Sequence, residues 1–359
     1  MNIGFDARWY FDGPVSGKLV VRNLLENLLY SDSATIWPIF RLRDKKRVKK
    51  KFGDINCIYT KRNNLLISNV FEIPFIKKAN EMDLIIFQNF NPIFGKFKKV
   101  NYIHDIIFED SPRYYTLIER IYFKPMKYCS RFADFVITIS KHEKERIIKH
   151  NYSKNVEYVH HGIDKLLSQF SNQDADRLNL PKKYILMVGR LNKRKNIGNL
   201  LKSIPMIEDK DVKLVIVGER DWKNPDIDSL LEKEEIKSKV IFYSNLTTEQ
   251  LGAVYNFSKA LCFVSFDEGF GLPIIEAMNF GIPVIVSNTS VMPEIAGSAG
   301  ININPYNSKS IASAINKIFS DKDFYSRYSR LSKERSKNFS WAQSSKKIIK
   351  LCKEYVKTN

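Results

Sequence analysis

Two glutamates, Glu268 and Glu276, are separated by seven residues that join an apolar segment to a helical one. The run before them is apolar and short, which is typical of a buried strand in a parallel sheet. Gly269 and Gly271 allow a tight turn and close approach of a ligand, and Pro273 suits the first turn of a helix. We therefore predict a strand, a glycine-rich turn and a helix, with a carboxylate on each side of the turn.

The helix in this segment would direct its N-terminal amides to the carboxyl ends of the strands. Open α/β sheets bind ligands there, so an anionic ligand is expected. A carboxylate accepts hydrogen bonds from two adjacent hydroxyl groups, as found on a hexose or a ribose. Two carboxylates beside an anion site thus fit a nucleotide sugar. An ordinary strand, turn and helix is the alternative, because glycine-rich turns are common.

A second turn of this kind follows the apolar run 184–188 and begins at Gly189. It carries Arg190, whose guanidinium is a planar fork, and Lys195, whose ammonium is a point charge. The two cations are positioned to converge on one diphosphate. Solvated surface basicity is the alternative in a chain this rich in lysine.

These two segments resemble the retaining glycosyltransferases of family 4, which have the GT-B fold. The family's glutamate pair and its phosphate-binding pattern stand at Glu268, Glu276, Gly189, Arg190, Lys195 and Asn196. Residues 281–287, 292–297 and 339–341 resemble the next strand, its following turn and the start of the last helix. The N-terminal half is also similar to the family, at residues 3–8, 12–17, 104–105 and 133–140.

The resemblance implies an α/β protein with two Rossmann-like parallel-sheet domains facing across a cleft. Residues 1–165 would bind the acceptor and residues 166–340 the nucleotide sugar. Residues 341–359 would form a helix that packs back on the first domain. The polar stretch 168–176 indicates a domain boundary between Asp164 and Pro181.

The resemblance also implies roles for single residues. Glu276 would hold the ribose diol, Glu268 the sugar hydroxyls, and Arg190 with Lys195 the diphosphate, while His104 would contact the donor sugar near its anomeric carbon. The expected catalytic group is His104, Glu268, Arg190 and Lys195. The expected donor site is Gly189, Arg190, Lys195, Asn196, Ser244, Asn245, Glu268, Gly269, Phe270, Gly271, Leu272 and Glu276. The acceptor or phosphate loop is Gly13, Ser16, Gly17 and Asp105. A structural role at a strand end is the alternative for His104, as plain turns are for Gly13 and Gly17.

The expected reaction is retaining transfer of a hexose, with mannose favoured, to a saccharide or polyprenyl-diphosphate-linked saccharide. Such a reaction would build bacterial O-antigen, capsule or lipopolysaccharide. GDP-mannose is the favoured donor and a UDP-sugar the alternative, because the N-terminal pattern and the Pro293-Glu294 turn look most like mannosyltransferase-like members of the family. The chain departs from the family at Ser244-Asn245, where glycine is common, and at His161, where asparagine is usual, so the family's base preference does not carry over directly. A GT-B sugar-nucleotide epimerase and a non-catalytic GT-B partner protein are the alternative functions.

No metal or cofactor is expected. The aspartate pairs at residues 174 and 176 and at residues 226 and 228 do not end apolar strands, and positive side chains with helix amides can neutralise a departing diphosphate. The four cysteines are far apart, which indicates a reducing compartment and no zinc site.

The length of 359 residues and the 44% hydrophobic content fit two globular domains. The chain shows no secretion signal or membrane-spanning run, so we expect it in the cytoplasm. The resemblance implies peripheral association with the inner face of the cell membrane, because many enzymes of the family glycosylate lipid-linked acceptors. The net charge is +19, and the run 41–51 is strongly basic. That run is either a solvated face, a contact with anionic lipids, or a nucleic-acid contact that no motif supports.

Strands are predicted where short apolar runs alternate with helical ones, which indicates parallel sheets. In the first half they lie near residues 2–6, 35–40, 83–88, 100–104, 135–139 and 156–160. In the second half they begin near Tyr184, Val212, Val240, Ala260 and Pro283. A helix with one apolar face is expected from Trp341 to Val356.

Overall fold

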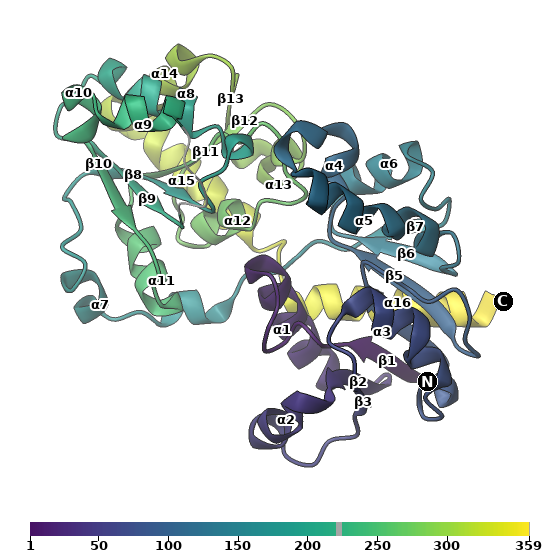
Figure 1. Cartoon of the computed structure of the whole chain (residues 1–359). Helices are drawn as coiled ribbons and strands as arrows, with labels where there is room; N and C mark the ends of the chain where they lie inside the picture. The colour runs from purple at the N-terminus through teal and green to yellow at the C-terminus, as the bar shows by residue number, and fades with distance from the viewer. Residues whose placement is uncertain (220–224, 359) are drawn as a thin grey trace. The chain divides into compact units, whose positions relative to one another are not determined.

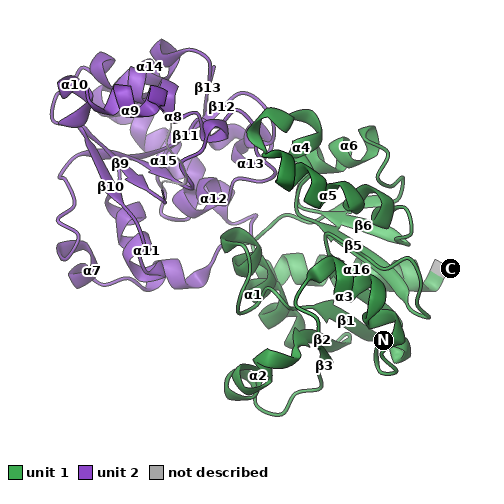
Figure 2. Ribbon diagram, in the orientation of Figure 1, with its two compact units in different colours: residues 1–162, 340–359 green, residues 163–339 purple. Residues whose placement is uncertain are grey.

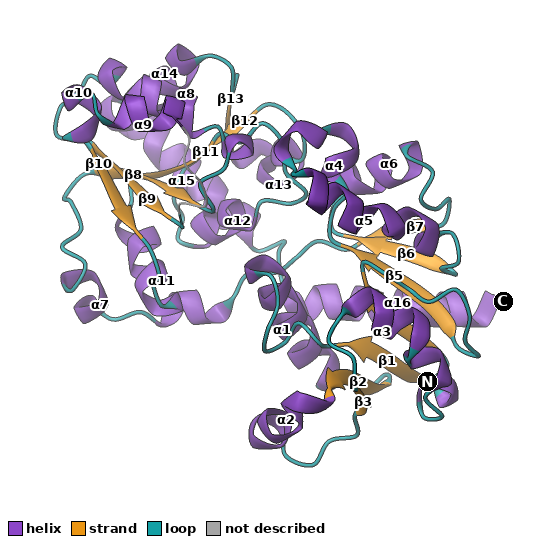
Figure 3. Cartoon of the chain, viewed as in Figure 1, coloured by secondary structure: helices purple, strands orange, loops and turns teal. Residues whose placement is uncertain are grey.

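The structure is a computed structural model that describes residues 1–219 and 225–358. The chain divides into two compact units, one of residues Met1–Gly162 and Ser340–Asn359 and the other of residues Ile163–Phe339 (Figure 2). Each unit contains one parallel sheet with helices on its faces (Figure 3). The α/β class predicted from the alternation of apolar runs is confirmed.

The first unit has a seven-stranded sheet in the order β3-β2-β1-β4-β5-β6-β7 (Figure 1). Its strands are β1 (Asn2–Asp6), β2 (Thr35–Arg41), β3 (Ile58–Thr60), β4 (Leu84–Gln88), β5 (Lys98–Ile103), β6 (Phe135–Thr138) and β7 (Val156–Tyr158). Its helices are α1 (Val15–Leu29), α2 (Lys45–Phe52), α3 (Leu65–Phe71), α4 (Ile107–Asp110), α5 (Leu117–Ser130), α6 (Lys141–Lys149) and α16 (Trp341–Thr358). The last helix, α16, packs against α1.

The second unit has a six-stranded sheet in the order β10-β9-β8-β11-β12-β13. Its strands are β8 (Tyr184–Val188), β9 (Lys213–Val217), β10 (Val240–Tyr243), β11 (Ala260–Phe263), β12 (Val284–Ser287) and β13 (Gly300–Ile303). Its helices are α7 (Asn172–Asp176), α8 (Ile197–Ser203), α9 (Pro225–Leu231), α10 (Glu234–Lys237), α11 (Thr248–Phe257), α12 (Leu272–Asn279), α13 (Met292–Ala296), α14 (Ser308–Ser320) and α15 (Lys322–Ser336).

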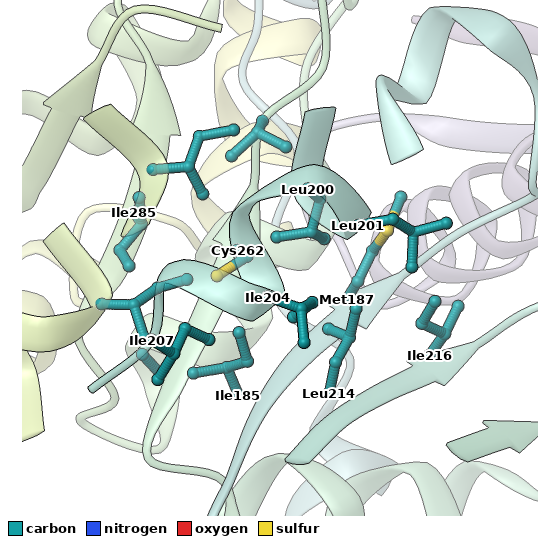
Figure 4. Packing of buried hydrophobic residues seen from close by; sticks show 14 of the residues in the cluster. Ile185, Met187, Leu200, Leu201, Ile204, Ile207, Leu214, Ile216, Cys262 and Ile285 are labelled. Carbon is teal, nitrogen blue, oxygen red and sulfur yellow. The ribbon is translucent and has the colours of Figure 1, made fainter. Parts of the chain in front are cut away.

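The core of the second unit forms where helix side chains meet one face of the sheet (Figure 4). Leu200 and Leu201 of α8 lie with Ile185 of β8, Leu214 of β9 and Cys262 of β11, and all five are buried completely. Burying such side chains supplies the main favourable free energy of folding, at about 1.5 to 3 kcal/mol for each large aliphatic residue. This packing fixes the strands whose carboxyl ends carry the candidate site.

The unit boundary differs from the sequence prediction. The chain changes unit between Gly162 and Ile163, before the predicted interval of 164–181. The polar stretch that suggested a linker folds instead, because a short 3-10 turn at Lys165–Gln169 and helix α7 both contact α11. Two strands were also missed, β3 and β13, since both are short and lie at sheet edges.

Candidate functional site

The site of the second unit lies at the point where the strand order of the sheet reverses. β8 and β11 are neighbours in the sheet although the 71 residues 189–259 lie between them in the chain. β9 and β10 continue the sheet on one side of this point, and β12 and β13 continue it on the other. Ligands of doubly wound sheets bind in the crevice that such a reversal leaves. The backbone amide of Phe266 donates to the carbonyl of Arg194 at 2.9 Å, which ties the two turns together.

The centre of this site is a carboxylate held by two cations. Nη1 of Arg194 lies 2.6 Å from Oε2 of Glu268, and Nζ of Lys195 lies 2.8 Å from Oε1 of the same residue. All three side chains are largely buried, with the Glu268 side chain 9% exposed. Paired charges of this kind are tolerated away from water because each offsets the desolvation of the other.

The protonation of this cluster follows from the same neighbours. Burial alone would raise the pKa of Glu268, but Arg194 and Lys195 outweigh it and lower the pKa to about 2. Burial lowers the pKa of Lys195, and the carboxylate of Glu268 opposes that shift. Glu268 is therefore ionised at neutral pH, and the cluster carries an excess of positive charge beside the turn.

Lys195 is placed by the turn that precedes α8. Gly189 has φ +135°, and a Cβ added there would lie 3.1 Å from Cε of Lys195, so glycine gives the lysine stem its room. Asn192 caps the 3-10 turn Lys193–Lys195 by accepting from the Lys195 amide at 3.2 Å. Asn196 has the left-handed φ of 58°, and its buried amide group donates to the carbonyls of Val264 and Pro305 at 2.9 and 2.7 Å. Asn196 thus joins the turn after β8 to the turn after β11 and to the segment after β13.

The turn after β11 is fixed by side chains on both sides. Nη1 of Arg194 donates to the carbonyl of Asp267 at 2.5 Å, and the hydroxyl of Ser290 donates to the Asp267 carboxylate at 2.6 Å. Ser290 also accepts from the amide of Glu268 at 3.2 Å. Gly271 follows with φ +97° as the N-cap of α12, which has no side-chain cap. Pro273 has no amide hydrogen and the Ile274 amide donates to the Gly271 carbonyl at 3.0 Å, so the amides that can face a ligand here are those of Gly271 and Leu272.

Glu276, the second glutamate of the pair, lies inside α12 and is buried. The hydroxyl of Tyr255 on α11 donates to Oε2 of Glu276 at 2.7 Å. Burial raises the pKa of Glu276 to about 7; the Tyr255 hydrogen bond opposes the shift and the charge of Asp164 adds to it. Burial likewise raises the pKa of Tyr255 well above its ordinary value. Tyr255 hence stays protonated and keeps donating to Glu276.

The other predicted donor-site residues lie on three segments: the turn after β8, the segment after β10 and the turn that leads into α12. Arg190 is exposed, on the turn that carries Lys195. Ser244 and Asn245 are exposed directly after β10, two strands away from β8 in the sheet. Phe270 is 4% exposed and lies against Phe339 with ring centroids 6.1 Å apart, so only its backbone can face a ligand. Gly269 is buried in the same turn, and Leu272 begins α12 half-buried.

In the first unit, His104 follows β5 and packs among aromatic rings. Its ring centroid lies 5.3 Å from that of Trp9, and its Nε2 is 2.9 Å from Oε1 of Gln88 at the end of β4. Burial lowers the pKa of His104 to about 4. The imidazole is thus neutral at pH 7, held by Gln88 and shielded by Trp9.

The glycine loop after β1 is shaped by the same tryptophan. A Cβ at Gly13 or Gly17 would come within 2.8 or 2.9 Å of Trp9 side-chain atoms, so the room left by these two glycines is filled by the indole. Ser16 is exposed in the first turn of α1. Asp105 accepts from the Ile107 amide at 3.4 Å, at the start of α4. A role for this loop in binding phosphate or acceptor stays a prediction.

The basic run 41–51 does not form one uniform surface. Arg41 is 8% exposed and donates to the carbonyls of Arg8 and Asp12 at 2.7 and 3.1 Å. Arg47 pairs with Asp12 and Asp44 at 2.9 and 3.2 Å. The lysines of the run are exposed on α2, a short helix whose Val48 is buried.

Among residues 1–219 and 225–358, no group of three or more His, Cys, Asp and Glu side chains is arranged to hold a metal ion. Within the same described ranges, no helix combines the length and the apolar character needed to cross a membrane.

Sequence reasoning missed Arg194, Tyr255 and Trp9. Arg194 stands between two lysines, and its only signal was that three consecutive cations precede Asn196. Tyr255 belongs to a different helix from Glu276, so its contact depends on how α11 packs against α12. Trp9 lies directly between the first strand and the glycine loop, where a large ring beside glycines was the available hint.

Comparison with known proteins shows which proteins this chain resembles. Residues 168–335 match the family model of the glycosyl transferases group 1. The O-antigen chain mannosyltransferase RfbU of Salmonella typhimurium is 31% identical over 231 residues, which is 63% of this chain and 62% of that protein. The O-antigen chain mannosyltransferase B of Escherichia coli is 30% identical over 169 residues, or 46% of this chain and 44% of that protein. The chain thus matches less than two thirds of the length of either relative.

The fold has close counterparts among solved structures. Sucrose-phosphate synthase from Thermosynechococcus elongatus superposes with a TM-score of 0.75 over 100% of both chains, at 20% identity. At that identity the likeness establishes the fold alone. Residues 168–335 are thus similar to the glycosyl transferases group 1, and the two parallel-sheet units of the chain have the GT-B fold.

Proposed function

We propose that this chain transfers a hexose from a nucleotide diphosphate sugar to a saccharide or lipid-linked saccharide during synthesis of a bacterial surface polysaccharide. Mannose is the favoured sugar and GDP-mannose the favoured donor, since the relatives RfbU and mannosyltransferase B are named as O-antigen mannosyltransferases. The family match of residues 168–335 supports the reaction class.

The observation that carries the proposal is the buried cluster of Arg194, Lys195 and Glu268. It lies where the sheet order reverses, next to the uncapped start of α12. A diphosphate is drawn to such a point by the local cations and by the helix amides together. Lys195 would leave Glu268 for the phosphate oxygens, while Arg194 keeps the carboxylate ionised.

Binding of the donor would then use the two glutamates differently. Glu268, held by Arg194, would accept hydrogen bonds from hydroxyl groups of the transferred sugar. Glu276 would accept from the ribose hydroxyls in place of Tyr255, which requires it to be ionised. His104 of the first unit, being neutral, would contact the donor sugar near the anomeric carbon as a hydrogen-bonding group.

In the reaction, the acceptor hydroxyl oxygen bonds to the anomeric carbon as the bond from that carbon to the diphosphate oxygen breaks. The electron pair of the broken bond stays on the diphosphate, and the hydroxyl proton passes to a phosphate oxygen. Arg190, Lys195 and the backbone amides near Gly271 and Leu272 stabilise the charge that develops on the leaving group. We propose retention of configuration, with the acceptor entering on the face that the diphosphate leaves.

A panel of nucleotide sugars in a thermal-shift assay tests donor binding. A donor that binds only the folded chain raises its unfolding temperature, by mass action. We expect GDP-mannose to give the largest shift, and a larger shift with a UDP-sugar would replace it as donor. No shift with any nucleotide sugar would contradict the proposal.

The same donor, incubated with and without a lipid-linked acceptor, separates the alternative functions. A glycosyltransferase releases nucleotide diphosphate and forms a new linkage in the presence of acceptor, and the anomeric configuration of the product then tests retention. An epimerase converts the nucleotide sugar without acceptor. A non-catalytic partner protein binds the donor and gives neither product.

A further inference from the structure

Tyr306 presents an aromatic ring to solvent beside the donor site of the second unit. The residue is 63% exposed and lies in the loop that joins β13 to α14. Its ring stacks on that of Phe266, with centroids 4.9 Å apart and planes 27° from parallel. Phe266 is half-buried and stands two residues before Glu268. We call Tyr306 and Phe266 the aromatic pair.

The backbone on both sides of the aromatic pair is tied to the turn that carries the donor-site cations. The amide of Phe266 donates to the carbonyl of Arg194 at 2.9 Å. The carbonyl of Pro305 accepts from the side-chain amides of Asn196 and Asn199 at 2.7 and 3.0 Å. The exposed tyrosine is therefore held in place before any ligand arrives. A ring that is fixed in this way loses little conformational entropy when a ligand stacks on it.

Two exposed asparagines border the ring in sequence. Oδ1 of Asn304 accepts from the amide of Tyr306 at 2.9 Å, and Oδ1 of Asn307 accepts from the amides of Lys309 and Ser310 at 3.0 and 3.4 Å. In the part of the chain that the structure describes, the Nδ2 groups of both asparagines have no hydrogen-bond partner. A pyranose matches such a surface, because the C–H groups of one ring face pack on an aromatic ring and its hydroxyl oxygens accept from amides.

The order of the strands indicates which part of the reactants lies here. Ser244 and Asn245, in the segment expected to read the nucleotide base, follow β10 at one edge of the sheet. Glu268, assigned to the transferred sugar, follows β11, and Tyr306 follows β13 at the opposite edge. The aromatic pair thus lies on the side of the transferred sugar that faces away from the base. The acceptor, and not the nucleotide, is the saccharide that belongs there.

We propose that Tyr306, supported by Phe266, binds a pyranose ring of the acceptor saccharide. Asn304 and Asn307 donate hydrogen bonds to hydroxyl oxygens of the same sugar. The inference rests on the proposed function, because it takes the acceptor to be a saccharide. It adds a residue that selects the acceptor, since an acceptor with several sugars gains this contact and one without a sugar at this position does not.

Proton NMR of mannotriose titrated with the full chain tests the contact without donor or turnover. The ring current of an aromatic side chain moves the signals of a stacked sugar upfield. We expect this shift with the unaltered chain and with Tyr306→Phe, which keeps the ring. Tyr306→Ala should abolish the shift and weaken binding about tenfold, on the scale of one aromatic contact.

Steady-state kinetics separates this role from a structural one. With the donor identified by thermal shift, Tyr306→Ala should raise the KM for a saccharide acceptor about tenfold and leave the KM for the donor unchanged. Damage to the loop would raise both constants, because the same loop is bonded to Asn196 in the donor site. Tyr306→Phe should restore the KM for the acceptor.

Phe257→Ala is the matched control. Phe257 is 47% exposed and also packs on another ring, that of Phe170, with centroids 6.4 Å apart. It ends α11 directly before β11, so it lies at the amino end of the strands, away from the donor site. This variant should bind mannotriose as the unaltered chain does.

Thermal shift with the donor shows whether each variant is folded and binds donor. The inference is overturned if the unaltered chain gives no upfield shift with mannotriose. It is also overturned if Tyr306→Ala keeps the shift and the KM for the acceptor, or changes the KM for donor and acceptor alike. Donor binding without contact to mannotriose would leave the proposed function standing, so the two failures are distinguishable.

Discussion

The ammonium of Lys195 lies 2.8 Å from Oε1 of Glu268, and both side chains are buried beside the start of α12. Without a ligand, the cation assigned to the donor phosphate is thus neutralised by the carboxylate assigned to the donor sugar. Arg194 holds the other oxygen of Glu268 at 2.6 Å. Lys195 can therefore move from Glu268 to a phosphate oxygen of the donor while Arg194 still pairs with the carboxylate. This exchange of partners underlies the first two predictions.

Replacing Lys195 with alanine should lower turnover by roughly 10²-fold or more, because one of the positioned charges on the leaving diphosphate is lost. Steady-state kinetics with the donor identified by thermal shift measures this. Lys202→Ala is the control, since Lys202 is exposed in the last turn of α8, at the opposite end of that helix from Lys195, and its loss should leave turnover unchanged. Near-normal turnover in Lys195→Ala would remove this lysine from the site.

Arg194→Met should act through Glu268 rather than on the phosphate. In this variant Lys195 is the only cation left beside the Glu268 carboxylate. When Lys195 moves to the diphosphate, the buried carboxylate has no cationic partner, so we expect the KM for the donor to rise more than kcat falls. The free energy of unfolding should drop by about 1 to 3 kcal/mol, as for loss of a buried charged hydrogen bond. Urea unfolding measures this, and Arg194→Lys should restore part of both properties. A variant that loses kcat alone would instead place Arg194 on the reacting groups.

Glu276 should make stability and donor binding depend on pH in opposite senses. Its pKa in the folded chain, about 7, lies above the ordinary value of 4.5. The folded state therefore holds this proton more tightly than the unfolded state, and its contribution to stability is complete below pH 4.5. The free energy of unfolding should fall by about 3 kcal/mol as the pH rises from 4.5 through 7. Donor affinity should increase over the same interval, because ribose hydroxyls bind the ionised carboxylate.

Glu276→Gln should flatten both dependences, as measured by thermal unfolding and donor titration between pH 5 and 8. Glu232→Gln is the control, because the Glu232 side chain is 79% exposed. If the Glu276 variant keeps the full slope of stability against pH, the titrating group is another residue.

Gly189→Ala should destabilise the second unit and disturb Lys195. Alanine is strained at φ +135°, and its Cβ would lie 3.1 Å from Cε of the lysine, so we expect a loss of about 1 to 3 kcal/mol. Gly198→Ala is the matched control, since a Cβ there meets no atom within 4 Å and alanine favours the helix. Urea unfolding of both variants should therefore give changes of opposite sign, and equal changes would rule out the steric explanation.

Much of the fold could be predicted because local patterns and tertiary structure agree. The strands β1, β2, β4, β6, β8 and β11 are apolar runs between glycine, proline or polar turns, and all were expected near their observed positions. The edge strands β3 and β13 were missed because three or four residues carry too weak a pattern. The segment at residues 165–176 was misread because polar composition suggests a linker, whereas here it packs on α11.

The sequence alone determined the two turns, their glycines and their charges, because these follow from residue type and spacing within one segment. Only the tertiary structure decided which charges meet. The reversal of strand order puts β8 beside β11, so Glu268 reaches Arg194 as well as Lys195. Packing of α11 on α12 buries Glu276 against Tyr255, and that burial gives the carboxylate a pKa that no local pattern encodes. Pairing and desolvation depend on neighbours distant in the chain, and these neighbours convert a pair of similar glutamates into two different groups.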